Sequence, residues 1–268
     1  SASGSHEVRG KTLGIIGYSN IGSQLSVVAE ALGMRVLFYD IEEKLAMGNA
    51  HRCDTLNELL EQSDVVTLHV DGRKSNTGFF GEDQFEHMKQ DAIFINLSRG
   101  FVADLDALKK HLDSGHLSGA AVDVFPIEPK KTGDEFLTDL ADEDNMILTP
   151  HIGGSTLEAQ KSIGQFVSQR LEDYWFKGST MLSVNLPQIT LSDIKSNFRI
   201  AHLHANLPGV LARVNRVLGE DGINIAAQAL GTEGEIGYVV TDVAQRPDQR
   251  ALDQLASIEG TIRMRVIS

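Results

Sequence analysis

Residues 12–22 read TLGIIGYSNIG, an apolar run that leads directly into a glycine-punctuated turn. The run Thr12–Ile16 is rich in leucine and isoleucine, which is typical of a strand covered on both faces. A dinucleotide-binding turn needs a glycine for the tight bend, a second where the backbone approaches pyrophosphate, and a third for helix–strand packing. Gly17 and Gly22 fill the first and third positions, whereas Ser19 stands at the second. The stretch therefore predicts the first strand, turn and helix of a dinucleotide-binding domain.

The alternation of apolar runs and amphipathic segments continues as far as Pro150. Further strands are predicted at Arg35–Tyr39, Asp64–Val70, Ala92–Leu97, Gly119–Val124 and Met146–Thr149. Helical periodicity predicts helices at Ile21–Leu32, Leu56–Gln62, Glu82–Met88 and Leu105–Ser114. Six strands interleaved with helices indicate an α/β domain, a Rossmann-type doubly wound parallel sheet. We assign this domain to residues 7–154 and leave Ser1–Ser5 outside the fold as a loose linker.

A carboxylate, Asp40, follows the second predicted strand. At this place in a dinucleotide fold an acid binds the adenosine ribose hydroxyls and repels a 2′-phosphate, so NAD is favoured over NADP. The β-carbon of Ser19 is expected to crowd the pyrophosphate. A glycine-rich turn that binds nothing is the alternative, although strand, turn, helix, strand and acid in this order argue against it. The residues of the turn predicted to contact NAD are Gly17, Tyr18, Ser19, Asn20, Ile21 and Gly22.

Polar clusters follow the last three predicted strands, at Asn96–Gly100, Asp123–Pro129 and Thr149–Gly154. The carboxyl ends of parallel strands meet at one sheet edge, where ligands bind in open α/β sheets. There Arg99 can grip a carboxylate and polarise the neighbouring carbonyl. His151 can exchange a proton with a substrate hydroxyl, and a paired Glu128 would orient its ring. Taken one at a time, Arg99 could be a solvated surface charge, Glu128 the cap of a turn and His151 a buried ring. Together they predict the catalytic trio of a hydroxyacid dehydrogenase.

The composition excludes several classes of partner. The 24 basic and 37 acidic residues give a formal net charge of −13, which repels nucleic acid and anionic lipid. No apolar run approaches the roughly 20 residues of a membrane-spanning helix. The single cysteine, Cys53, excludes an intramolecular disulfide and fits a reducing cytoplasm. We therefore expect a cytoplasmic protein with neither a nucleic-acid nor a membrane partner, and we predict no metal site.

The C-terminal part is predicted to hold a long helix, a linker and a small domain. Ser155–Phe176 has a helical pattern, whereas Lys177–Asn197 has no sustained period. Alternating strands and helices are then predicted at Arg199–His204, Val210–Asp221, Ala226–Gly231, Gly237–Val243, Gln249–Ser257 and Thr261–Ile267. This βαββαβ order is the ferredoxin-like arrangement. We assign residues 155–196 to the helix and linker, and residues 197–268 to the small domain.

Asn96–Gly100, Asp123–Pro129 and Thr149–Thr156 resemble the signatures of the D-isomer-specific 2-hydroxyacid dehydrogenases. The last domain resembles the ACT domain, a small-molecule sensor that pairs side by side across subunits. The family resemblance implies that Arg99 binds the substrate carboxylate and that His151, paired with Glu128, is the general acid/base. It also implies further cofactor contacts at Leu97, Ser98, Arg99, Asp123, His151, Gly153 and Gly154. Asp71 stands where proline is frequent in the family.

The combination of this family with an ACT domain implies NAD-dependent oxidation of D-3-phosphoglycerate to 3-phosphohydroxypyruvate, with 2-oxoglutarate reduction as a further activity. It also implies a homotetramer inhibited by L-serine, which His204, Asn206 and Asn224 would hold where two ACT domains pair. In the family the larger part of the substrate domain precedes the dinucleotide fold. We therefore expect Ser155–Phe176 to be the returning helix of that domain, and these 268 residues alone to turn over little. Two alternatives stay open: another D-2-hydroxyacid dehydrogenase, or a non-catalytic sensor of a nucleotide or amino acid.

Overall fold

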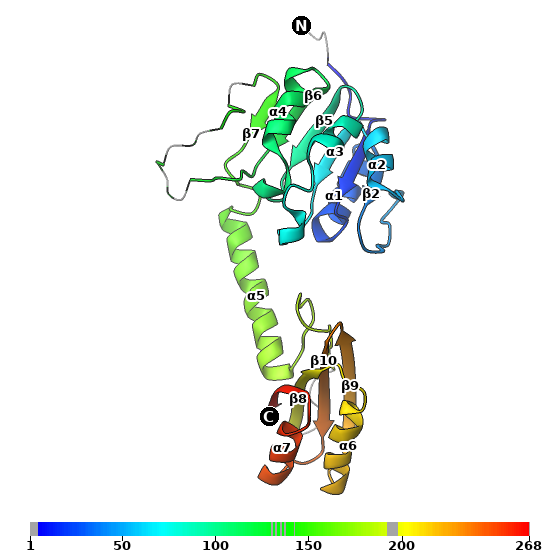
Figure 1. Cartoon of the computed structure of the whole chain (residues 1–268), viewed down its shortest axis with the longest axis vertical. Coiled ribbons are helices and arrows are strands. Elements are labelled where there is room, and N and C mark those ends of the chain that lie inside the picture. Colours follow the sequence, from blue (N-terminus) through cyan, green and yellow to red (C-terminus); the bar gives the residue numbers. More distant parts are fainter. Residues whose placement is uncertain are drawn as a thin grey trace. The chain divides into compact units, whose positions relative to one another are not determined.

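The apolar runs of the N-terminal part pair into one sheet of seven parallel strands, in the order β3-β2-β1-β4-β5-β6-β7 (Figure 1). The strands are β1 (Thr12–Ile16), β2 (Arg35–Tyr39), β3 (His51–Arg52), β4 (Val65–Leu68), β5 (Ala92–Asn96), β6 (Leu117–Val122) and β7 (Met146–Leu148). The computed structural model describes residues 5–267 apart from 130, 132, 135, 137, 142 and 192–197. The direction of strand order reverses between β1 and β4, which is the topological switch point of a doubly wound sheet.

The predicted Rossmann-type sheet is therefore confirmed, with one strand more than the sequence indicated. The additional strand, β3, has only two residues, and both side chains are exposed. A strand this short and polar leaves no apolar run to detect. The other six strands begin and end within two residues of the predicted positions.

Helices cover both faces of this sheet. Successive side chains of its strands point to opposite faces, and apolar side chains on each face are buried under helices. One core gathers Leu13, Ile15, Val36 and Phe38 under α1 (Asn20–Ala31). The other gathers Ile16, Leu37, Val66, Leu68 and Phe94 under α2 (Leu56–Gln62), α3 (Glu82–His87) and α4 (Leu105–Asp113). Two 3-10 turns, η1 (Lys74–Asn76) and η2 (Gly100–Val102), follow β4 and β5. Burial on both faces explains why these strands lack polar alternation.

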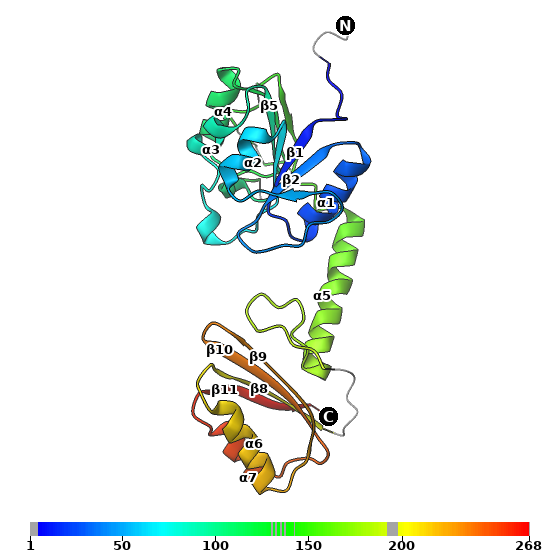
Figure 2. The same ribbon diagram turned by 90° about the vertical axis from the view of Figure 1, so that its right-hand side faces the viewer.

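A second unit begins at residue 157 and contains a sheet of four antiparallel strands, in the order β11-β8-β10-β9. Its elements are α5 (Leu157–Lys177), β8 (Phe198–Ala205), α6 (Val210–Glu220), β9 (Ile225–Glu233), β10 (Ile236–Val243), α7 (Gln249–Ala256) and β11 (Thr261–Ile267). α6 and α7 lie together on one face of the sheet (Figure 2). The predicted βαββαβ order is confirmed. The predicted boundary between residues 196 and 197 lies outside the described residues.

The segment that follows α5 is packed against the second sheet, although its sequence predicted a plain linker. Ile189 joins a core with Ala201, Tyr238 and Val240, on the sheet face opposite α6 and α7. The hydroxyl of Tyr238 donates to the Gly178 carbonyl at 2.8 Å. Since alternate side chains of β8 and β10 point to opposite faces, this segment covers the face that the two helices leave open.

The last turn of α5 is fastened to the same sheet by two arginines. Arg199 Nη1 donates to the Lys177 carbonyl at 2.7 Å, and Arg265 Nη1 donates to the Trp175 carbonyl at 3.0 Å. Arg199 is fully buried and also pairs with Asp242 at 2.5 Å. Cations at a helix C-terminus satisfy its last carbonyls and favour its dipole. The predicted long helix is thus confirmed and is part of the second unit.

Several large apolar side chains of α5 are exposed. Phe166, Leu171, Trp175 and Phe176 are each more than half exposed. None of the helices that the structure describes is long and apolar enough to cross a membrane.

Candidate active site

The central feature of the site is an ion pair between loops that follow β6 and β7. His151 Nδ1 lies 2.8 Å from Glu128 Oε2 and 3.1 Å from Oε1. The Phe125 amide donates to Glu128 Oε1 at 3.0 Å. Burial alone would raise the pKa of Glu128, but the hydrogen bonds from His151 and Phe125 outweigh it, so its pKa is lowered. An ionised Glu128 therefore faces one ring nitrogen and leaves Nε2 of His151 available for proton transfer.

His151 is held in a backbone conformation that few side chains adopt, with φ of 51°. The buried carboxylate of Asp123 supports this conformation by binding residues on both sides of His151 in the chain. It accepts hydrogen bonds from the Thr149 hydroxyl at 2.6 Å and from the amides of Ile152 and Gly153 at 2.9 and 3.1 Å. Burial by itself raises the pKa of Asp123. The hydrogen bonds from the three donors lower it by more, so the net shift of the pKa is downward. Asp123 is thus an anionic brace on both sides of His151.

This role of Asp123 was missing from the sequence interpretation, which named Asp123 only as a cofactor contact. Its three donors lie 26 to 30 residues away in the chain. No local pattern connects them, because parallel strands bring together loops that are distant in sequence. Most of the carboxylate's accepting capacity is already used within the protein.

Arg99 lies at the same sheet edge but does not share a hydrogen bond with the pair. Its Nη1 donates to the carbonyl of Ser98 at 2.7 Å, and its side chain passes beside Gly72. The next residue, Gly100, approaches the Phe125 backbone so closely that a β-carbon there would lie 2.0 Å from the Phe125 carbonyl carbon. Through Gly100 the Arg99 loop packs against the loop that carries Glu128.

A buried asparagine shapes the loop that carries Arg99. Asn96 Oδ1 accepts from the amide and hydroxyl of Ser98 at 3.0 and 2.8 Å, and Asn96 Nδ2 donates to the Arg99 carbonyl at 3.3 Å. Ser98 is therefore fully engaged in the loop, whereas Leu97 is 46% exposed. A short polar side chain at a strand end commonly supports a turn in this way. In the sequence, the asparagine at the end of an apolar run, two residues before a serine, was the sign that this turn exists.

The turn after β1 uses its two glycines as predicted. Gly17 has φ of 91°, and a β-carbon there would lie 2.6 Å from the His69 carbonyl oxygen. A β-carbon at Gly22 would lie 2.2 Å from the Gly17 carbonyl oxygen. Ser19 is the N-cap of α1 and makes no capping hydrogen bond through its side chain. The first amides of α1, at Asn20 and Ile21, therefore have no partner within the helix and can receive a phosphate.

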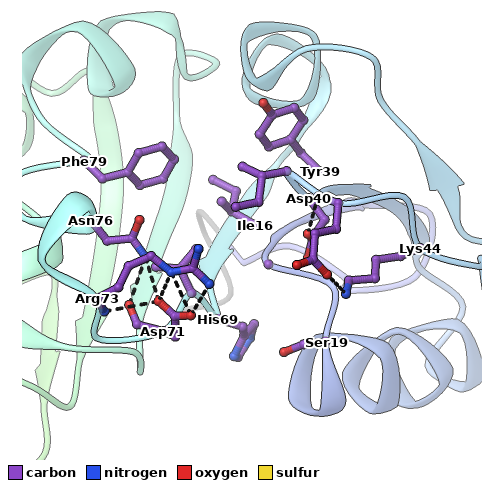
Figure 3. Close-up of a pocket in the computed structure, with 14 residues that line it drawn as sticks. Ile16, Ser19, Tyr39, Asp40, Lys44, His69, Asp71, Arg73, Asn76 and Phe79 are labelled. Atoms are coloured by element: carbon purple, nitrogen blue, oxygen red, sulfur yellow. Dashed lines mark hydrogen bonds and ion pairs between the residues drawn. The ribbon is translucent and has the colours of Figure 1, made fainter. Parts of the chain in front are cut away.

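Asp40 stands at the end of β2, beside this turn (Figure 3). Its Oδ2 accepts from the Tyr18 amide at 2.8 Å, and its Oδ1 accepts from the Glu42 amide at 2.9 Å. A pocket runs past Asp40, Gly17 and Ser19 to His69 in the loop after β4. Burial lowers the pKa of His69 to about 4, so this ring is neutral at physiological pH. A tight glycine turn, free helix amides and a strand-end carboxylate fit the pyrophosphate and ribose of a dinucleotide.

In the second unit, the three residues predicted to bind L-serine do not meet within one chain. His204 is buried at the end of β8, and the Asn206 side chain donates to the Gly234 carbonyl at 3.0 Å. Asn224 precedes β9 at the opposite end of the sheet, because Ile225 pairs with Val243 while Ala205 pairs with Ile236. A site that used all three would need residues from two copies of the domain.

Comparison with known families agrees with this geometry. Residues 1–153 match the model "D-isomer specific 2-hydroxyacid dehydrogenase, NAD binding domain". Residues 200–263 match the "AHAS small subunit-like ACT domain". The chain therefore belongs to the D-isomer-specific 2-hydroxyacid dehydrogenase family. It combines the NAD-binding domain of that family with an ACT domain, and its cofactor is NAD.

The curated relatives give a more specific name. D-3-phosphoglycerate dehydrogenase of Haemophilus influenzae is 51% identical over 267 residues, which cover 100% of this chain and 65% of the relative. The Escherichia coli K12 enzyme of the same name is 48% identical over 268 residues, covering 99% of this chain and 65% of the relative. The chain thus spans about two thirds of the length of these relatives.

Solved structures of the family resemble the chain in part. D-lactate dehydrogenase from Aquifex aeolicus, complexed with NAD and lactic acid, has a TM-score of 0.55 at 33% identity, covering 63% of this chain and 54% of that one. A glyoxylate reductase from Paecilomyes thermophila has a TM-score of 0.59 at 30% identity, covering 67% and 54%. Both similarities support the family assignment.

Proposed function

We propose that the protein containing these residues oxidises D-3-phosphoglycerate to 3-phosphohydroxypyruvate with NAD. The observation that supports this most strongly is the ion pair of Glu128 with His151, at the sheet edge that also carries Arg99 and the dinucleotide turn. The substrate assignment comes from the relatives named D-3-phosphoglycerate dehydrogenase.

In this proposal each residue of the trio has one task. Arg99 swings from the Ser98 carbonyl to bind the substrate carboxylate as a bidentate pair. Nε2 of His151 takes the hydroxyl proton while the carbon–oxygen bond becomes a carbonyl. Glu128 stabilises the imidazolium that results and keeps its ring oriented. NAD supplies the acceptor for the hydride that leaves the same carbon.

The residues proposed to hold the cofactor come from the segments that follow β1, β2, β5, β6 and β7. The amides of Asn20, Ile21 and Gly22 face the pyrophosphate, with Gly17, Tyr18 and Ser19 in the turn, and Asp40 binds the adenosine ribose. Toward the nicotinamide we propose Leu97, Ser98, Asp123, Gly153 and Gly154. The side chains of His151 and Glu128 are 41% and 34% exposed. Because water reaches them freely, we expect these 268 residues alone to bind the cofactor but to turn over slowly.

The experiment that tests the activity is NADH formation from a panel of D-hydroxyacids by the protein that carries these residues. D-3-phosphoglycerate should be preferred over D-lactate and D-glycerate, and the reverse reaction with 2-oxoglutarate tests the further activity. His151→Gln should lower kcat by at least about 100-fold, as expected for loss of a general acid/base. Saturable NADH binding with no turnover on any substrate would favour the alternative of a non-catalytic sensor.

For the second unit we propose L-serine as effector and a homotetramer as the assembly, in a cytoplasmic protein. Since Asn224 lies at the other end of the sheet from His204 and Asn206, each serine would be held by residues of two copies. Calorimetry with the wild-type chain should show heat of serine binding that is lost in Asn206→Ala and in Asn224→Ala. Heat that is unaltered in both variants would remove this assignment.

A further inference from the structure

The pocket beside the turn after β1 has charged side chains on both walls (Figure 3). Asp40 and Lys44 come from the loop after β2, and Asp71 and Arg73 come from the loop after β4. In the dinucleotide-binding proposal above, the adenosine ribose lies in this pocket, because Asp40 binds its hydroxyls. An arginine near that place is the usual partner of a 2′-phosphate. A free Arg73 at this place would favour NADP, so a preference for NAD requires that Arg73 be kept from the phosphate.

The guanidinium of Arg73 forms an ion pair with Asp71, a carboxylate of the same loop. Its Nε donates to Asp71 Oδ1 at 2.8 Å and its Nη2 donates to Asp71 Oδ2 at 2.6 Å. This is a bidentate pair, which fills one of the two edges of the guanidinium that can bind a phosphate in this way. Asp71 is fixed in turn, because its Oδ1 accepts from the Arg73 amide at 3.2 Å and from Asn76 Nδ2 at 3.1 Å.

The other basic side chain of the pocket is paired in the same manner. Lys44 Nζ lies 2.5 Å from Glu42 Oε2. Each cation on the described walls thus has a carboxylate two residues away in sequence. The lining carries more negative than positive charge, because it holds three carboxylates and two cations: Asp40, Glu42 and Asp71 against Lys44 and Arg73.

We propose that Asp71 is a specificity-determining residue, which withdraws Arg73 from the ribose 2′ position so that the pocket accepts NAD(H) and rejects NADP(H). The proposal rests on the NAD-binding function proposed above and adds a second determinant to Asp40. Asp40 repels the 2′-phosphate directly, whereas Asp71 removes the cation that could offset this repulsion.

The electrostatics of Arg73 agree with this arrangement. The hydrogen bond to Asp71 raises the pKa of Arg73 most, and the charges of Glu42 and Asp40 add to the increase. The guanidinium therefore senses the carboxylates of the opposite wall. The pair is also accessible, with side-chain exposures of 51% for Arg73 and 55% for Asp71. Exposed ion pairs are weak, so neutralising Asp71 should release Arg73 without unfolding the loop.

The test is a fluorescence titration of the 268-residue chain with NADH and with NADPH. Asp40→Asn removes the direct repulsion and keeps the side-chain shape. Asp40→Asn/Asp71→Asn also releases Arg73, and the triple variant with Arg73→Gln removes the released cation. We expect the double variant to bind NADPH about fivefold more tightly than Asp40→Asn does, with NADH affinity changed less than about twofold. The triple variant should lose this gain, and high salt should reduce it.

Three results would overturn the proposal. NADPH affinity could be equal in the single and double variants, or the gain could persist in the triple variant. NADH and NADPH could also gain equally, which would place Arg73 on the adenine ring instead of the 2′-phosphate. Arg73→Gln in the Asp40→Asn background is a second measurement, which should leave NADPH affinity unchanged because Arg73 is already withdrawn. If the wild-type chain bound neither cofactor, the NAD-binding function itself would be wrong, and this inference with it.

Discussion

Replacing Gly100 by alanine should disturb the candidate active site without touching any of its side chains. The added β-carbon would lie 2.0 Å from the carbonyl carbon of Phe125 and 2.5 Å from the nitrogen of Pro126. Both are backbone atoms, so no flexible side chain can move aside. The two loops must separate by about 1.4 Å to reach an ordinary contact of 3.4 Å. Gly100 is not among the glycines with positive φ, so the conflict is one of space alone.

The expected loss in the free energy of unfolding is about 3 kcal/mol, the upper end for overpacking a site that cannot relax. Part of it comes from the Phe125 amide, whose hydrogen bond to Glu128 is 3.0 Å long and would be strained by the same movement. A hydrogen bond to a charged group contributes roughly 1.5–3 kcal/mol. Glu128 should therefore hold His151 less well even in molecules that remain folded.

The assay is urea unfolding followed in two ways. Far-ultraviolet circular dichroism reports both units, whereas fluorescence reports the second unit, because the one tryptophan of the chain is Trp175 in α5. Gly100→Ala should shift the first transition and leave the fluorescence transition in place. Gly154→Ala is the matched control, since its β-carbon would meet nothing within 4 Å, and it should change stability by less than about 0.5 kcal/mol. A Gly100→Ala chain as stable as the wild type would show that the Gly100 and Phe125 loops can separate at no cost.

Three further predictions concern other parts of the chain. Asp123→Asn should destabilise the first unit by about 1–3 kcal/mol, because one of the acceptor oxygens that brace His151 becomes a donor; urea unfolding checks this, and an unchanged midpoint would contradict it. Burial, with a contribution from His204, lowers the pKa of His202 from 6.5 to about 4. The unfolded chain therefore takes up this proton first, so stability of the second unit should be complete above about pH 6.5 and fall by up to about 3 kcal/mol toward pH 4. His202→Gln should flatten that dependence of the Trp175 fluorescence transition, and an equally steep profile would show that His202 is not its source. Gly164→Ala should stabilise α5 by about 0.5–1 kcal/mol, because its β-carbon meets nothing within 4 Å; a loss of stability in thermal unfolding would argue against this.

Much of the fold could be predicted because burial leaves a direct mark on sequence. The strands of the first sheet are apolar on both faces, and β1 and β2 have the predicted bounds. β3 could not be predicted, since its two exposed residues contribute no apolar run. The segment after α5 looked like a linker because its packing depends on single residues such as Ile189, which have no periodicity.

The candidate site also has features that could be predicted from the sequence and features that could not. Glu128 and His151 could be proposed as a pair because each follows a strand whose carboxyl end reaches one edge. The brace formed by Asp123 and the approach of Gly100 to Phe125 could not, since both depend on contacts between loops far apart in the chain. Asp71 and Arg73 stand two residues apart, but only the structure shows them paired on the wall opposite Asp40 (Figure 3).

In the proposed mechanism His151, oriented by Glu128, exchanges the substrate proton beside NAD bound at the Gly17 turn. The most direct test of this mechanism is single-turnover oxidation of bound NADH by 3-phosphohydroxypyruvate, measured in the protein that contains these residues. We expect a rate at least about 100-fold lower in His151→Gln, with the Kd for NADH changed by less than about threefold. Equal rates in the wild type and in His151→Gln would contradict this mechanism.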